Sequence, residues 1–139
     1  MRILAVDHGT VRAGCAICDP TETIVRPLAV VSPPRPRAVA ALVGEQEAEL
    51  AVVGVPVSLD GREGKQAALA RAFAESLAGE LDGIPVDTYD ERLTTRLAEG
   101  SRRDGAGAPA DALAAAHLLE GYLARRRATV PADGEPGAR

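Results

Sequence analysis

The chain has 139 residues, of which 46% are hydrophobic and only 2% aromatic, and it carries 16 basic and 20 acidic side chains for a formal net charge of -4. This length fits one domain with a substantial core. The net negative charge argues against nucleic-acid binding by bulk electrostatics, so such binding would depend on local basic patches or on metal ions.

The first 31 residues predict three antiparallel strands joined by short turns. The run from Ile3 to Val6 consists of four consecutive apolar residues, which is typical of a strand buried on both faces, and Asp7 stands at its end. Pro27 indicates that the third strand lies at an edge of the sheet, because proline cannot donate to a strand ladder. The three strands are expected at residues 3–7, 12–18 and 23–31.

The chain has two cysteines, Cys15 and Cys18, with the spacing C-x-x-C. Both fall on the second predicted strand, where residues three apart point to opposite faces, so they can form neither a disulfide nor a shared metal site. A second cysteine pair is absent, which argues against a zinc site.

From residue 38 onward, helices alternate with strands. Val39, Leu42 and Val43 recur at helical spacing, and a later apolar stripe repeats every four residues at Leu69, Phe73, Leu77 and Leu81. Two further strands are expected at residues 50–55, a continuous apolar run, and at 84–89, where Pro85 marks the other edge. Helices are expected at residues 38–47 and 65–81, from Asp90 until Gly100, and after Pro109.

This element order is that of the ribonuclease H-like fold, an α/β fold. We expect a five-stranded mixed sheet, three antiparallel strands followed by two parallel ones, flanked by helices. One domain should span residues 1–127, followed by a disordered tail over 128–139 that is rich in proline and glycine. No signal peptide or run of 18 apolar residues is present, which predicts a cytoplasmic protein that does not enter a membrane.

Three carboxylates should converge at one edge of the sheet. Asp7 ends the first strand, Glu91 follows the fifth, and Asp111 lies in the first turn of the last helix, on the face that carries Leu118 and Tyr122. Grouped carboxylates repel one another, so a cluster in a cleft persists only if cations or protons neutralise it. Hard oxygen ligands favour Mg²⁺ or Mn²⁺, and two such ions can activate a water for phosphodiester hydrolysis.

Each acid also has a purely structural interpretation. Asp7 could cap the turn that follows it. Glu91 could pair with a neighbouring arginine on the surface, and Asp111 could complement the dipole of its helix. The three acids together favour a catalytic and metal-binding site.

Basic residues near these acids are candidates for holding a substrate phosphate, although each could equally be solvated surface. The candidate substrate-binding residues are Arg12, Lys65, Arg92, Arg102 and Arg103. His8, in the first turn, is either a proton shuttle or a bystander, and His117 is interpreted as structural.

The chain resembles the YqgF (RuvX) family of Holliday junction resolvase-like proteins, which are linked with pre-16S rRNA processing. The resemblance spans roughly residues 1 to 125 and rests on Asp7-x-Gly9-x-x-Arg12-x-Gly14, on Gly54-x-Pro56 with Asp60-Gly61, on Asp90-Glu91-Arg92-Leu93-Thr94-Thr95, and on Asp111-x-x-Ala114-Ala115 with Leu118-Leu119 and Tyr122-Leu123. It implies a ribonuclease H-like fold, a metal-dependent nuclease activity, and Asp7, Glu91 and Asp111 as catalytic residues. Two departures concern the grip on substrate: the loop before the last acid is shorter than the lysine-rich loop common in the family, and His8 stands where an apolar or aromatic residue is usual.

We therefore expect a metal-dependent nuclease that acts on RNA or DNA, in pre-16S rRNA processing or on branched or single-stranded substrates. A branched-DNA resolvase would need two active sites and hence a homodimer. One alternative is a binding module with the same fold that acts in ribosome assembly without turnover. Another is an ATPase like actin or Hsp70, which begins with a similar Asp-x-Gly-Thr hairpin but needs two such domains, for which this chain is too short.

Overall fold

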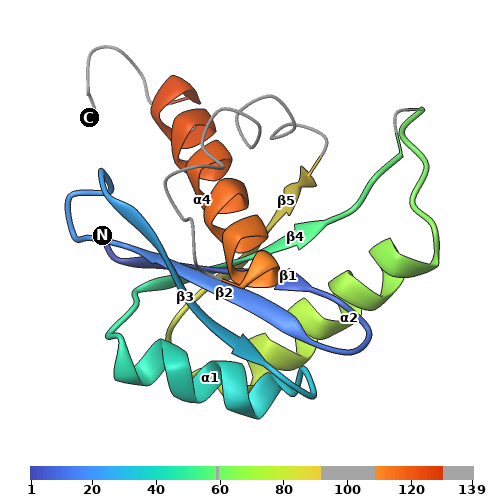
Figure 1. Cartoon of the computed structure of the whole chain (residues 1–139), viewed down its shortest axis with the longest axis horizontal. Coiled ribbons are helices and arrows are strands. Elements are labelled where there is room, and N and C mark those ends of the chain that lie inside the picture. Colours follow the sequence, from blue (N-terminus) through green and yellow to red (C-terminus); the bar gives the residue numbers. More distant parts are fainter. Residues whose placement is uncertain (59, 92–108, 130–139) are drawn as a thin grey trace.

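A five-stranded sheet in the order β3-β2-β1-β4-β5 lies at the centre of the structure (Figure 1). This computed structural model describes residues 1–58, 60–91 and 109–129. The strands are β1 Ile3–His8, β2 Ala13–Cys18, β3 Val25–Val31, β4 Leu50–Val55 and β5 Val86–Asp90, and the helices are α1 Pro36–Glu45, α2 Lys65–Glu80 and α4 Ala110–Thr129. β1, β2 and β3 pair antiparallel, whereas β4 is parallel to β1 and β5 is parallel to β4. The predicted arrangement of three antiparallel strands followed by two parallel ones is confirmed.

The buried and edge strands lie where the apolar runs and the prolines predicted them. Residues 3–6 of β1 and the whole of β4 are buried, because both strands have neighbours on either side and helices on either face. Pro27 lies in β3 and Pro85 precedes β5, and these two strands form the edges of the sheet. The parallel strands β1, β4 and β5 therefore all end at one side of the sheet.

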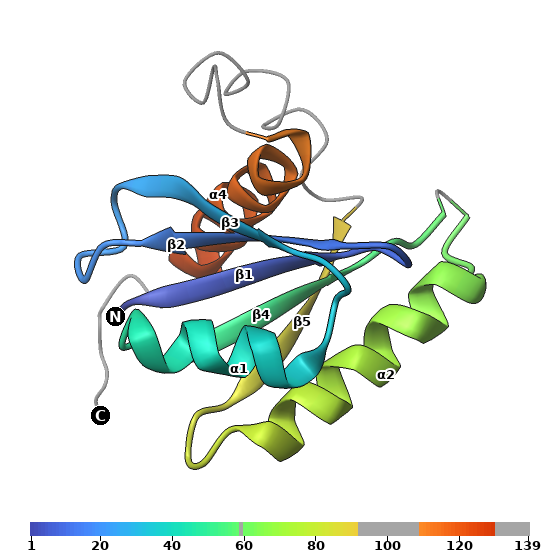
Figure 2. The ribbon, with the colours of Figure 1, turned by 60° about the horizontal axis from the view of Figure 1, so that its bottom comes forward.

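Helices cover both faces of the sheet. Figure 2 shows α4 on one face and the pair α1 and α2 on the other. Successive strand residues alternate between these faces, so β1 contributes Leu4 and Val6 to the core beneath α1 and α2, and Ile3 and Ala5 to the core beneath α4. The molecule thus has two apolar layers separated by the sheet.

The two cysteines lie in different layers, as predicted from their spacing. Cys15 packs beneath α1 and α2, Cys18 packs beneath α4, and both are free thiols. Burial raises the pKa of Cys15 to about 12, so this thiol stays protonated and serves as a small apolar core residue.

The apolar stripe predicted for α2 is only partly right. Phe73 and Leu77 are buried, but Leu69 is only half-buried. A repeat of four residues drifts around a helix with 3.6 residues per turn, so a strict series leaves the buried face. Small residues complete the contact with the sheet instead, namely Ala67, Ala70 and Ala74.

Several element boundaries differ from the predicted ones by one or two residues, and two of these differences have clear local reasons. α1 begins at Pro36 rather than at residue 38, because proline fits the first turn of a helix. β3 begins at Val25 rather than at residue 23, because the Asp19 carboxylate accepts hydrogen bonds from the backbone N–H groups of Thr23, at 2.8 Å, and Ile24, at 2.7 Å. These bonds hold the preceding residues in a turn.

The last helix, α4, continues through Thr129. The short helix predicted after Asp90 and residues 130–139 of the predicted tail lie outside the described residues. None of the helices within the described ranges has the length and apolar character needed to cross a membrane.

Candidate active site

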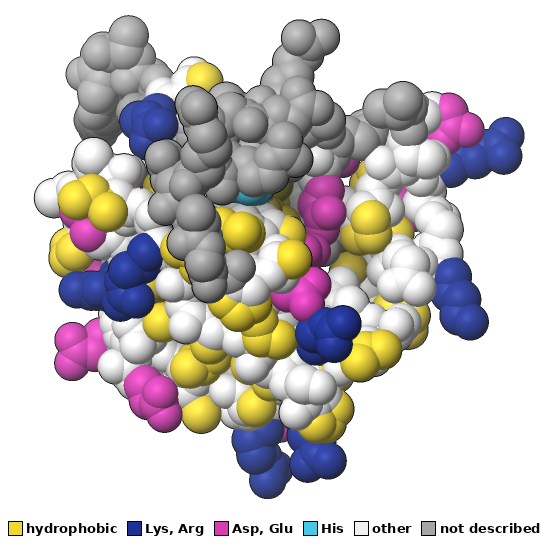
Figure 3. Space-filling view, viewed as in Figure 1, with side chains coloured by type: hydrophobic (Ala, Val, Ile, Leu, Met, Phe, Trp, Pro, Cys, Tyr) yellow, Lys and Arg dark blue, Asp and Glu magenta, His cyan; other side chains and the backbone are white. Residues whose placement is uncertain are grey.

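The candidate site lies where β1 and β5 end and α4 begins. Asp7 is on β1 and pairs in register with Gly14 of β2, Glu91 directly follows β5, and Asp111 is in the first turn of α4. Figure 3 shows acidic side chains gathered on this face of the molecule, where the ends of β4 and β5 meet the start of α4. The structure therefore brings together residues separated by more than 100 positions in the sequence.

Asp7 and Glu91 form a hydrogen-bonded pair of half-buried carboxyl groups, in which a protonated Glu91 donates to Asp7. Burial raises the pKa of Glu91 to about 7, and the negative charges of Asp7 and Asp90 add to the effect. Burial also raises the pKa of Asp7, and the charge of Asp111 acts in the same direction, although the hydrogen bond from Glu91 opposes it. One proton between the two carboxyl groups thus removes most of their mutual repulsion.

Asp111 lies near enough to influence Asp7, but its side chain is engaged elsewhere. The Nε atom of Arg12 donates to Oδ2 of Asp111 at 2.6 Å, and the two side chains are 54% and 43% exposed. A pair this exposed contributes little to stability, so it is easily exchanged for other partners. The predicted inward face of α4 is confirmed, because Leu118 and Tyr122 are buried against the sheet.

Across residues 1–58, 60–91 and 109–129, no three His, Cys, Asp or Glu side chains are arranged so that they could hold a metal ion as they stand. Asp111 is paired with Arg12, whereas Asp7 and Glu91 are in direct contact with each other. Those two still suit a hard cation. Their oxygens are the donors that Mg²⁺ and Mn²⁺ prefer. The proton between them neutralises negative charge that a bound cation would neutralise instead.

Glycines allow the acidic residues to approach the sheet. A Cβ atom at Gly54 of β4 would overlap Glu91 Oε2 and the Cδ1 atom of Leu118, and one at Gly14 of β2 would overlap the backbone carbonyl of Asp111. Both glycines belong to the motifs noted in the sequence, but the sequence did not reveal which side chains they admit. Only the absence of a side chain at these two positions lets β5 and α4 bring their carboxylates close to β1.

The structure says less about the other predicted substrate-binding residues. Lys65 is exposed at the start of α2, and its role in substrate binding stays a prediction. Arg92, Arg102 and Arg103 lie outside the described residues.

His8 points away from the acidic pair. Its ring lies 4.7 Å from that of Phe73, between centroids, on the face covered by α1 and α2, and its buried Nδ1 atom has no hydrogen-bond partner within the described residues. Burial lowers the pKa of His8, which favours the neutral imidazole. This position favours the bystander interpretation over a proton shuttle. His117 is buried in α4, which fits its structural interpretation.

Comparison with known families places the chain among resolvase-like proteins. The family model described as RuvX, Holliday junction resolvase, matches residues 1–125. A candidate pre-16S rRNA nuclease of Anaeromyxobacter sp. (strain Fw109-5) is 44% identical over 138 residues, covering 92% of this chain and 100% of that protein. Another, of Rhodococcus erythropolis, is 37% identical over 152 residues and covers 99% of this chain and 86% of that protein.

Solved structures share the same fold. Thermus thermophilus RuvC in complex with a Holliday junction substrate aligns with a TM-score of 0.68 at 16% identity, over 93% of this chain and 97% of that one. The Holliday junction resolvase of fowlpox virus, in complex with junction DNA, aligns with a TM-score of 0.56 at 12% identity, over 91% and 99% of the two chains. The predicted ribonuclease H-like fold, in its RuvC-like form, is confirmed.

Proposed function

Because this chain belongs to the RuvX family, we propose that it is a nuclease that hydrolyses phosphodiester bonds in nucleic acid with the help of Mg²⁺ or Mn²⁺. The observation that carries the proposal is the pairing of Asp7 with Glu91 at the ends of β1 and β5. Two partly buried carboxyl groups held side by side disfavour the folded state once both are ionised, so a cation that binds between them best accounts for their arrangement.

Asp7 and Glu91 would hold the ion, and Asp111 would complete the site. When bound, the metal supplies a polarised water as nucleophile and neutralises charge on the leaving oxygen. The carboxyl groups contribute oxygen ligands from β1, where Asp7 is paired with β2, and from the residue that directly follows β5, so the sheet limits their movement. Glu91 would release its proton on metal binding, since a metal-bound carboxylate is ionised.

Arg12 and Asp111 would change partners when substrate binds. A phosphate offers the Arg12 guanidinium a charged acceptor with better geometry than the present contact with one carboxylate oxygen. Once released, Asp111 could turn towards Asp7, whose pKa already responds to its charge. Substrate binding would thereby complete the acidic site.

The substrate we propose first is precursor ribosomal RNA, which the names of the relatives indicate for those proteins. Processing of that RNA would take place in the cytoplasm. Cleavage of a four-way DNA junction is the other candidate reaction, and it would require two active sites and therefore a homodimer.

The test compares wild type with Asp7→Asn and with Asp82→Asn, the same chemical change at an exposed acid far from the site. Each protein is incubated with RNA, single-stranded DNA and a four-way junction in a titration of Mg²⁺ and of Mn²⁺. We expect wild type and Asp82→Asn to cleave equally, and Asp7→Asn to be at least about a hundredfold slower. Equal cleavage by all three proteins would assign the activity to a contaminant.

A second candidate function is a nucleic-acid-binding module without turnover. It is favoured by the contact between Asp111 and Arg12, which leaves the described residues without a ready three-ligand site. This function predicts that wild type and Asp7→Asn bind RNA with equal affinity and that neither cleaves it at any metal concentration.

A further inference from the structure

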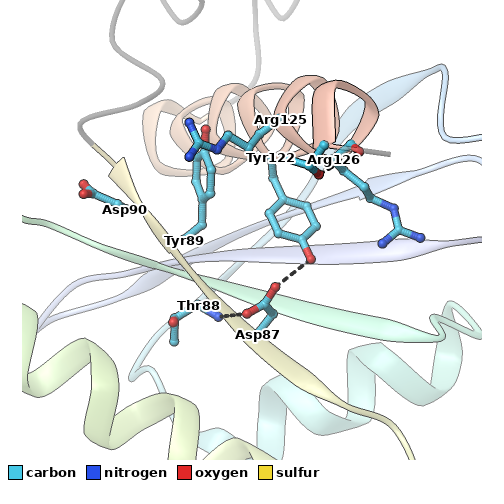
Figure 4. Close-up of a pocket in the computed structure, with 8 residues that line it drawn as sticks. Asp87, Thr88, Tyr89, Asp90, Tyr122, Arg125 and Arg126 are labelled. Carbon is cyan, nitrogen blue, oxygen red and sulfur yellow. Dashed lines mark hydrogen bonds between the residues drawn. The ribbon is translucent and has the colours of Figure 1, made fainter. Parts of the chain in front are cut away.

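A groove of about 440 Å³ lies between β5 and the C-terminal half of α4 (Figure 4). Tyr89 and Tyr122 form its floor, with their rings edge to face and the centroids 5.6 Å apart. The chain has two tyrosines, one phenylalanine and no tryptophan, so this groove contains two of its three aromatic side chains. Arg125 and Arg126 of α4 also line it.

The groove adjoins the acidic site. Asp87 and Tyr89 lie two residues apart on β5, so both face α4, and Glu91 follows the end of this strand. The contact of Tyr122 with Asp87, and the closeness of Glu91 to both Gly54 and Leu118, agree with this placement. Two residues of chain span at most about 7 Å, so the backbone of Tyr89 lies within the length of one nucleotide from that of Glu91.

One of the two arginine side chains that line the groove is available to bind a ligand. Both carboxylate oxygens of Asp87 are used, since Oδ2 accepts from the Tyr122 hydroxyl at 2.9 Å and Oδ1 accepts from the backbone N–H of Thr88 at 2.8 Å. Arg126 is paired with Glu22 at 2.9 Å. Arg125, by contrast, is exposed and forms no ion pair with any residue in the described part of the chain.

Figure 4 shows Arg125 reaching from α4 over Tyr89, whereas Asp90 points away from the two tyrosines. Within residues 1–58, 60–91 and 109–129, the Tyr89 hydroxyl has no hydrogen-bond partner, so it can donate to a ligand in the groove. The helix dipole does not account for Arg125, because the basic residues in the last turn of α4 are Arg126 and Arg127. A free guanidinium beside a phenol is suited to a phosphate ester.

We propose that the β5–α4 groove binds the backbone of one unpaired strand of nucleic acid next to the bond held at the acidic site, with Arg125 contacting a phosphate and Tyr89 donating a hydrogen bond to the same strand. This inference rests on the proposed nuclease function and adds the path that the strand takes across the protein. The groove has the volume of a small-ligand pocket, which suits one nucleotide unit of a single strand rather than a base-paired duplex. The tyrosine edges would contact the sugar or base of that unit.

The test measures binding in an Asp7→Asn background, where cleavage does not interfere, in the presence of Mg²⁺. Arg125→Gln is compared with Arg37→Gln, which removes the same charge from a side chain that is 88% exposed on α1. Fluorescence anisotropy with an unstructured oligoribonucleotide of about 12 nucleotides gives the dissociation constants, a length within the usual site sizes for single strands. Arg125→Lys tests whether charge alone is sufficient.

We expect Arg125→Gln to raise the dissociation constant about tenfold and Arg37→Gln to change it less than about twofold, because only Arg125 makes a charge-assisted contact. Arg125→Lys should fall between them. Arg125→Gln should also make the plot of log K against log salt less steep, by the amount expected for the loss of about one phosphate contact. A photoreactive thiouridine in the oligonucleotide should crosslink to peptides that contain Tyr89 or Tyr122.

Equal dissociation constants for Arg125→Gln and Arg37→Gln, without crosslinks to either tyrosine, would overturn the proposed role of the groove. If wild type still cleaves RNA, the proposed nuclease function would stand. If wild type cleaves no nucleic acid and the Asp7→Asn background binds none, the proposed function itself fails and the groove inference fails with it. A matching unfolding temperature for the two glutamine variants ensures that a loss of affinity at Arg125 does not reflect misfolding.

Discussion

At the N-terminal end of α4, Glu91 lies beside two other acidic residues, Asp7 and Asp90, whereas at the C-terminal end Glu22 lies between two positive groups. Glu22 contacts Nε of Arg126 at 2.9 Å and the amino group of Met1 at 3.2 Å. Burial raises the pKa of Glu91 to about 7, and the hydrogen bond from Arg126 lowers that of Glu22. A glutamate side chain therefore destabilises the fold at one end of the helix, at Glu91, and stabilises it at the other, at Glu22.

This difference separates residues kept for function from residues kept for the fold. A carboxylate among positive groups stabilises the fold, and this contribution accounts for its presence. A carboxyl group that is desolvated among other acids has no such explanation, and this is why its shifted pKa marks a candidate functional site. Changes at the two ends should therefore affect activity and stability in opposite ways.

The largest effect is expected from Glu91→Gln. Glutamine can still donate a hydrogen bond to Asp7, but it removes a metal ligand, so cleavage should fall at least about a hundredfold. The unfolding temperature of the metal-free protein at neutral pH should stay the same or rise, because one of the repelling charges is gone. Cleavage rates and thermal unfolding curves of the same preparations check both. A variant that cleaves like wild type would remove Glu91 from the site.

A steric change should damage the acidic end without altering any charge. Gly54→Ala places a methyl group against Glu91 and Leu118, which should cost about 1 to 3 kcal/mol of unfolding free energy and misplace the carboxylate. Chemical denaturation and cleavage assays measure the two effects. Gly44→Ala is the matched control, because a Cβ there meets nothing within 4 Å. In the α1 helix it should stabilise the protein by about 0.5 to 1 kcal/mol and leave activity unchanged.

The role of Gly54 shows where sequence reasoning stops. The buried strands and the meeting of Asp7 with Glu91 could be predicted, because apolar runs identify central strands and parallel strands end at one edge. A glycine in such a run looks like a small core residue until the packing partners from β5 and α4 are known. Those partners lie 37 and 64 positions away, and no local pattern encodes a contact at that separation.

Other features of the site also separate into those that the sequence predicts and those that depend on how the elements pack. The orientation of His8 could have been predicted, because it follows Asp7 directly on a strand and therefore points to the opposite face. The contact of Arg12 with Asp111 could not, since it depends on how closely α4 approaches β2. The β5–α4 groove likewise exists only once the two elements are packed together.

The pH dependence of stability should sharpen the contrast between the two ends. The pKa of Glu91 is raised from 4.5 to about 7, so the folded state binds an extra proton in that interval. Its contribution is fully present below pH 4.5 and is lost as the pH rises through 7. We expect the metal-free protein to lose about 1 to 2 kcal/mol over this range, a value reduced for partial exposure. Thermal unfolding in EDTA measures it, and Glu91→Gln should abolish the loss, whereas a slope that persists in this variant would assign it to other groups.

The smallest effect is expected at the paired end. Glu22→Gln removes the negative charge between Arg126 and the amino group of Met1 but leaves the acidic site untouched, so unfolding free energy should fall by about 0.5 to 1 kcal/mol with no change in cleavage. Because the pKa of Glu22 is lowered, its contribution is present above pH 4.5 and is lost as the pH falls further. Wild type should therefore be more stable than Glu22→Gln at pH 7 and converge with it in acid, whereas Glu91→Gln should be at least as stable as wild type at pH 7. If Glu22→Gln instead reduced cleavage, the two ends of α4 would be coupled, and the pairing of Arg126 beside the β5–α4 groove would be part of substrate binding rather than of stability alone.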